Sequence, residues 1–108
     1  MSDTSSKPLT GPALEAAPAA AVVAQIRLKL TEAFSPEILE IEDESHKHAG
    51  HGGWRPGGAT HFQIRIVSRA FSGVGRVQRQ RAVMRVLKEE LAARVHALGL
   101  AVEAPPAR

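Results

Sequence analysis

The histidines of this chain are gathered in one short stretch. Four of the five fall within residues 43–71, namely His46, His48, His51 and His61. Five glycines and a proline separate His48 from His61, a content too high for helix or strand. Imidazole nitrogens bind metals, and functional groups are often displayed on loops between regular elements. The stretch therefore predicts a functional loop.

The absence of cysteine narrows this chemistry. It excludes disulfides, cysteine-based zinc sites and a thiol nucleophile within the chain. A soft metal or a cluster would bind here only through histidine, with thiolates supplied by another molecule. No apolar run reaches the length of a membrane span, and Asp3 breaks the pattern of a signal peptide. We therefore expect a cytoplasmic protein with no membrane partner.

An enzymatic site is not predicted, and neither is a small-molecule substrate. Asp43 and Glu44 are neighbours on an expected strand, so their carboxylates point to opposite faces and form no acid/base pair. Ser45 lies near His46 and His48, but the sequence offers no assured third member of a triad.

The elements that position the loop follow from periodicity. Residues 1–17 carry no large apolar stripe, which predicts a disordered tail. Apolar residues then recur at helical spacing from Pro18 to Phe34, and Pro36 ends that helix.

Three strands are expected from alternating patterns, over residues 38–44, 61–68 and 95–103. The first two flank the loop and most simply form an antiparallel hairpin. In the last strand, Leu98 lies on the face covered by helices and His96 has the same parity. His61 has the opposite parity to Phe62, so it is expected to face away from the helices.

One long helix is expected over residues 76–93. Its predicted buried stripe, flanked by Val83, consists of Val77, Met84, Leu87 and Leu91. With a further helical turn around residues 69–72, the order predicts an α+β domain over residues 18–104: α-β-β-α-α-β, a three-stranded sheet covered by helices on one face.

Five landmarks, in order, resemble those of the BolA-like family and cover about residues 26–102. They are Asp43-Glu44-Ser45 with His48, Thr60-His61-Phe62, Phe71-Ser72-Gly73, Gln78-Arg79-Gln80-Arg81 and Val95-His96-Ala97-Leu98. The resemblance implies a class II KH-like fold, in agreement with the order that periodicity predicts. The chain differs from many members in Gln80, where a histidine is frequent, and in a longer loop that contains His51.

The resemblance also implies a partner and a cofactor. BolA-like proteins pair with a monothiol glutaredoxin and share a [2Fe–2S] cluster that also uses glutathione; the isolated chain would hold no cofactor. His96 corresponds to the family's ligand at the start of the last strand, and His48 to its loop ligand. His51 is the rival loop ligand, and His61 is a less favoured one. For His96 the alternative is a histidine satisfied beneath the helices, for His48 and His51 it is a solvated loop or an adventitious Zn or Ni site, and for His61 it is a residue that orders the base of the loop.

A second function is binding to DNA, which the resemblance implies for some members as transcriptional regulators. The net charge is +3. Basic residues gather in and next to the long helix, at Arg76, Arg79, Arg81, Arg85 and Lys88. Such a row suits phosphate contacts, and its alternative interpretation is a solvated helix face.

Overall fold

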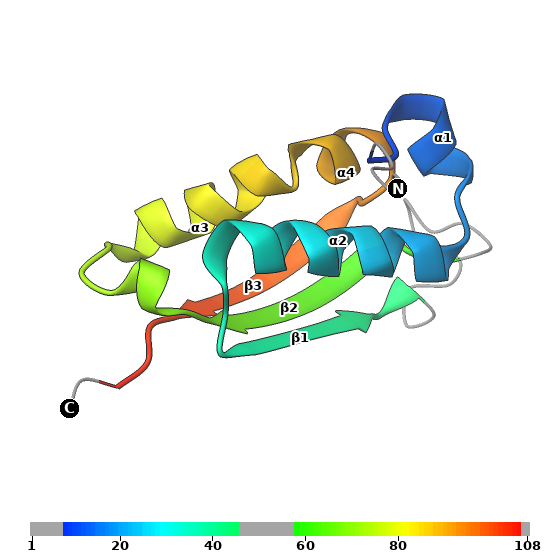
Figure 1. Cartoon of the computed structure of the whole chain (residues 1–108). Helices are drawn as coiled ribbons and strands as arrows, with labels where there is room; N and C mark the ends of the chain where they lie inside the picture. The colour runs from blue at the N-terminus through cyan, green and yellow to red at the C-terminus, as the bar shows by residue number, and fades with distance from the viewer. Residues whose placement is uncertain (1–7, 46–57, 107–108) are drawn as a thin grey trace, which may run out of the picture.

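The computed structural model describes residues 8–45 and 58–106 of the chain. Three strands form one sheet, and the helices cover one of its faces (Figure 1). The elements, in chain order, are α1 (Gly11–Ala16), α2 (Ala19–Phe34), β1 (Ile38–Asp43), β2 (His61–Val67), η2 (Arg69–Phe71), α3 (Arg76–Val86), α4 (Lys88–Ala93) and β3 (Ala97–Glu103). The predicted α+β architecture is confirmed.

The central strand β2 organises both the sheet and the core. β1 pairs with β2 in antiparallel register, as the hairpin prediction requires, and β3 pairs with β2 in parallel. Phe62, Ile64 and Ile66 alternate along β2 and are all buried. They belong to the same core cluster as Ile26 of α2 and Leu87 beside α3. Burial of alternate residues on one face is what fixes the register of the strand.

This topology brings one end of each of the three strands to the same edge of the domain. Because β1 runs against β2 while β3 runs with it, β1 ends where β2 and β3 begin. We call this the histidine end of the sheet, and define it by residues 43–45, 58–61 and 94–97. Both described ends of the predicted loop, Ser45 and Gly58, belong to it.

The expected disordered tail is wrong for residues 8–17; residues 1–7 lie outside the described part of the chain. These residues form α1 and its flanks, and α1 packs against α4 (Figure 1). Leu14 is fully buried in the core cluster. At Leu9 the backbone exchanges two hydrogen bonds with the side-chain amide of Gln25, at 2.7 and 2.9 Å. One fully buried leucine, the partly buried Leu9 and Ala17, and a few polar contacts to distant residues hold the segment, and they produce no sequence periodicity.

The long helix over 76–93 is also corrected. It is divided at Leu87, whose backbone angles are φ −97° and ψ 20°, into α3 and α4. Val77 and Met84, predicted to be buried, are 60% and 44% exposed. The buried side is centred on Val83 and Leu87.

The unexpected member of this buried side is Glu90, whose side chain is fully enclosed. One of its carboxylate oxygens lies 2.8 Å from Lys29 Nζ and accepts a 2.7 Å hydrogen bond from Gln25. A buried carboxylate requires such partners. Because the buried face of this segment includes a charged residue, a prediction from the spacing of apolar residues alone assigned the wrong face.

Within the described residues, no helix combines the length and hydropathy that crossing a bilayer would require.

Candidate ligand site at the histidine end of the sheet

The two described ends of the loop are tied together by Ser45. This buried residue follows β1, and its hydroxyl accepts hydrogen bonds from the backbone N–H groups of Thr60 at 2.9 Å and His61 at 3.2 Å. The Ser45 hydroxyl in turn donates to Asp43 Oδ1. Buried backbone donors need such acceptors, so Ser45 fixes where the chain re-enters the sheet.

The other carboxylate oxygen of Asp43 shapes the exit from the loop. Asp43 Oδ2 accepts a 2.8 Å hydrogen bond from the backbone of Ala59. Gly58 and Ala59 both have positive φ, at 75° and 63°. A Cβ on Gly58 would stand 2.9 Å from Asp43 Oδ2, so a side chain there would meet both steric contact and backbone strain.

His61 lies inside this base. Its side chain is 7% exposed, and its Nδ1 lies 2.9 Å from the hydroxyl of Thr60. It stands at the first position of β2, opposite in parity to the buried Phe62. The geometry suits a residue that orders the loop base better than one that meets a ligand from a partner.

His96 is accessible instead. It is exposed, and its backbone N–H donates a 2.7 Å hydrogen bond to the carbonyl of Thr60. The alternative of a histidine satisfied beneath the helices is therefore wrong. β3 begins only at Ala97, so the alternation of the strand does not extend back to His96. The residue has a fixed backbone and an open imidazole at the histidine end.

The remaining predicted ligands, His48 and His51, lie outside the described residues, as does His46. Across residues 8–45 and 58–106, no three histidine, aspartate or glutamate side chains are grouped to hold a metal ion.

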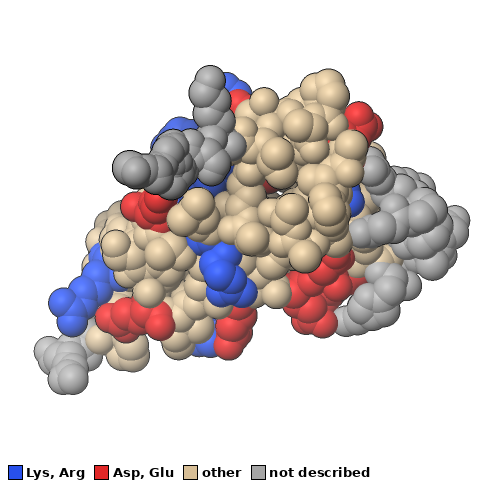
Figure 2. All heavy atoms as spheres, turned by 45° about the vertical axis from the view of Figure 1, so that its right-hand side comes forward, with Lys and Arg blue, Asp and Glu red and all other residues tan. Residues whose placement is uncertain are grey.

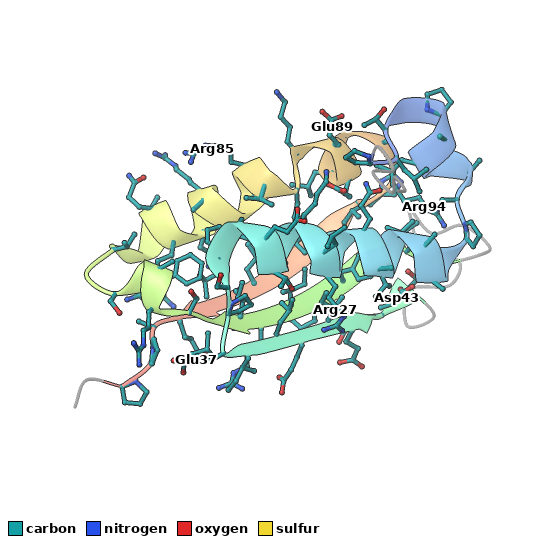
Figure 3. The ribbon with its side chains drawn as sticks, in the orientation of Figure 1. Arg27, Glu37, Asp43, Arg85, Glu89 and Arg94 are labelled. Atoms are coloured by element: carbon teal, nitrogen blue, oxygen red, sulfur yellow. The ribbon has the colours of Figure 1, made fainter. Side chains whose placement is uncertain are left out.

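The predicted basic row, on α3 and the first residue of α4, divides into two kinds of residue. Arg76, Arg81, Arg85 and Lys88 are exposed, and Arg85 extends away from the sheet (Figure 3). Arg79 is half-buried and donates to the carbonyls of Val74 at 2.7 Å and Val102 at 3.3 Å. One of these hydrogen bonds connects α3 to the turn before it and the other connects α3 to β3, so Arg79 is less suited to contact a phosphate than the exposed members of the row. Over the face in Figure 2, cationic and anionic side chains are interspersed.

The comparison with known proteins decides the family. The BolA-like protein family matches residues 30–106. This chain belongs to the BolA-like family.

Several relatives show how far the likeness extends. The chain is 51% identical over 81 residues to an uncharacterised protein from the cobS 5′ region of a Sinorhizobium species, covering 74% of this chain and 87% of that protein. It is 46% identical to human BolA-like protein 1, covering 78% of this chain and 58% of the human protein. The BolA domain of SufE1 from Arabidopsis thaliana is similar in structure, with a TM-score of 0.68 and 43% identity over 76% of this chain and 90% of that domain. A relative in Haemophilus influenzae, 38% identical over 74% of each chain, is named DNA-binding transcriptional regulator BolA.

At two places in this BolA-like site, sequence reasoning missed the structural role of a residue. Asp43 and Ser45 form a local turn in which Asp43 Oδ1 accepts from the Ser45 backbone at 2.9 Å. An aspartate two residues before a serine at the end of a strand is a recognisable signal for such a turn. Arg94 was missed as well, and no local signal identifies it, since its acceptors lie 36 to 80 positions away in the chain.

Proposed function

We propose that this BolA-like chain is a non-enzymatic adaptor that binds a monothiol glutaredoxin and shares a [2Fe–2S] cluster with it. The observation that carries the proposal is that His96 is exposed at the histidine end of the sheet, where both described ends of the predicted loop lie. Its backbone is held by Thr60 at 2.7 Å, so the imidazole starts from a defined position. Pre-positioned ligands lose less freedom on binding than mobile ones.

The donor set fits a shared cluster and does not fit a cluster held by this chain alone. The chain has no cysteine, and imidazole replaces thiolate on one iron of a [2Fe–2S] centre in known cluster chemistry. The thiolates would come from the glutaredoxin and glutathione. His96 would supply one imidazole from this chain. His48 is the proposed second ligand, with His51 as its alternative and the buried His61 as the least suited.

The test is to mix the chain anaerobically with its host's cluster-loaded monothiol glutaredoxin. The isolated chain is expected to be colourless, because it lacks thiolates, and the mixture to form a heterodimer whose visible absorption differs from that of the glutaredoxin alone. His48→Ala should shorten the cluster lifetime more than His61→Ala. A comparable loss in His51→Ala would assign the loop ligand to that residue. A mixture that forms no heterodimer and retains the spectrum of glutaredoxin alone would contradict the proposal.

A second candidate function is DNA binding through α3. Two observations favour it: Arg81, Arg85 and Lys88 are exposed on one segment, and the Haemophilus relative carries the name of a DNA-binding regulator. Arg79 is left out of this proposed surface because of its hydrogen bonds to the backbone.

Replacing Arg81, Arg85 and Lys88 together with glutamine should weaken binding to duplex DNA. If all three contact phosphates, the slope of log affinity against log salt should fall in magnitude by roughly 2 to 3, since each contact releases about 0.9 counterion. Arg27 of α2, Arg65 of β2 and Arg69 of η2 provide a control triple of equal charge on other elements, all changed to glutamine. Equal losses in both triples would show that only net charge matters and would remove α3 as the proposed surface.

A further inference from the structure

Arg94 occupies an unusual place at the histidine end. It follows α4 and lies near α1 (Figure 3), and it is 4% exposed. Its guanidinium donates to backbone carbonyls from two distant parts of the chain. Arg94 Nη1 donates to the carbonyls of Leu14 at 3.1 Å, Glu15 at 3.0 Å and Ala17 at 2.7 Å. Arg94 Nη2 donates to the carbonyl of Gly58 at 2.9 Å.

One side of the guanidinium therefore holds the end of α1. The last carbonyls of a helix lack an N–H donor from a following turn of the helix, and an arginine near them can donate to them. The other side holds the first described residue after the loop. A planar fork with donors on two sides can join two segments in this way, whereas the ammonium of a lysine is a single compact group.

His96 is fixed by the same contacts. Arg94 is two residues before His96, and the intervening Val95 is buried with its N–H donating to the carbonyl of Glu90 at 2.8 Å. On the other side, Gly58 leads through Ala59 to Thr60, whose carbonyl accepts the N–H of His96. Arg94 thus restrains both the chain that carries His96 and the chain to which His96 is bound.

We infer that Arg94 is a positioning residue for His96, and that through it residues 8–17 become part of the ligand site. The inference rests on the proposed role of His96 as a ligand, and it adds Arg94 as a residue that determines the position of His96. Residues 8–17 precede the part of the chain that matches the family, residues 30–106. The BolA-like domain would accordingly present His96 in an ordered form only while α1 is docked.

The experiment measures order at His96 in the free full-length chain and, separately, cluster retention in the complex. Arg94→Lys keeps the positive charge but removes the planar guanidinium group with its donors on two sides. Arg27→Lys is the matched control, because Arg27 makes a single 3.3 Å hydrogen bond to the carbonyl of Leu39 at an exposed site. Amide hydrogen exchange is read at His96 and, as a reference for global opening, at Ile64 in the central strand.

In Arg94→Lys, exchange at His96 should accelerate roughly tenfold or more, because charge-assisted hydrogen bonds to buried carbonyls are lost. Exchange at Ile64 should change less, and Arg27→Lys should change neither amide. Deleting residues 1–17 should accelerate His96 exchange in the same way. Combining the deletion with Arg94→Lys should add little, since both remove one set of contacts.

Equal acceleration at His96 and Ile64 would reveal a purely structural role and overturn the inference, as would additive effects of the deletion and Arg94→Lys. In the complex, Arg94→Lys should shorten the cluster lifetime. If His96 exchange accelerates while the lifetime stays unchanged, Arg94 does not position a ligand. If the wild-type chain forms no cluster-bearing complex, the proposed function fails, whereas the exchange data still decide whether Arg94 orders His96.

Discussion

Replacing His96 with alanine is expected to abolish the cluster-bearing heterodimer with a monothiol glutaredoxin while the domain stays folded. The substitution removes an exposed imidazole, whereas the backbone hydrogen bond from residue 96 to Thr60 needs no side chain. We therefore expect the free energy of unfolding to change by no more than about 0.5 kcal/mol, as at other surface positions. Visible absorption of the anaerobic complex and urea unfolding of the free chain measure the two effects.

His61→Ala is the control for this experiment. Both residues lie at the histidine end, but His61 is 7% exposed and contacts Thr60 through its side chain. Its removal is expected to lower the free energy of unfolding by about 1 to 3 kcal/mol, the usual cost of losing a buried hydrogen-bonding partner, and to weaken the complex only indirectly. A His96→Ala chain that forms a complex of unchanged spectrum and lifetime would exclude His96 as a ligand.

The sheet and the end at which the histidines gather were predictable from local patterns. Phe62, Ile64 and Ile66 alternate with polar residues because β2 buries one face, and this period identifies the strand without tertiary information. Pro36 likewise gives a local stop for α2, which ends at Phe34. Once β1 and β2 are a hairpin, both ends of the intervening loop must lie at one end of the sheet.

The parts that were not predictable depend on partners distant in the sequence. Glu90 is buried because Lys29 and Gln25 reach it from α2, so its charge misleads any assignment of the buried face from apolar residues alone. His96 is exposed and lies just before β3, which starts at Ala97, two residues later than the predicted residue 95. Boundary residues of this kind are set by the competition between neighbouring elements, here α4 and β3.

The N-terminal segment is the clearest case of structure that depends on distant partners. Its buried leucine, Leu14, is the site of the second substitution for which we expect a large effect. An amphipathic stripe needs several apolar residues, yet α1 is only six residues long and contributes one fully buried side chain, Leu14. The other attachments of the N-terminal segment include the carbonyls held by Arg94 and the hydrogen bonds between the Leu9 backbone and Gln25, which leave no trace in side-chain periodicity. Short docked segments are thus indistinguishable from disordered tails by composition.

Leu14→Ala is accordingly expected to lower the free energy of unfolding by about 2 to 4 kcal/mol, because it removes buried methyl groups and leaves a cavity. Leu28→Ala is the matched control: the same chemical change at a residue that is 57% exposed should cost no more than about 0.5 kcal/mol. Urea unfolding of both variants, followed by far-UV circular dichroism, gives the comparison. If the two leucines prove equally dispensable, α1 does not stay docked in solution. The exposed His96 would then be ordered by the sheet alone, without any contribution from residues 8–17.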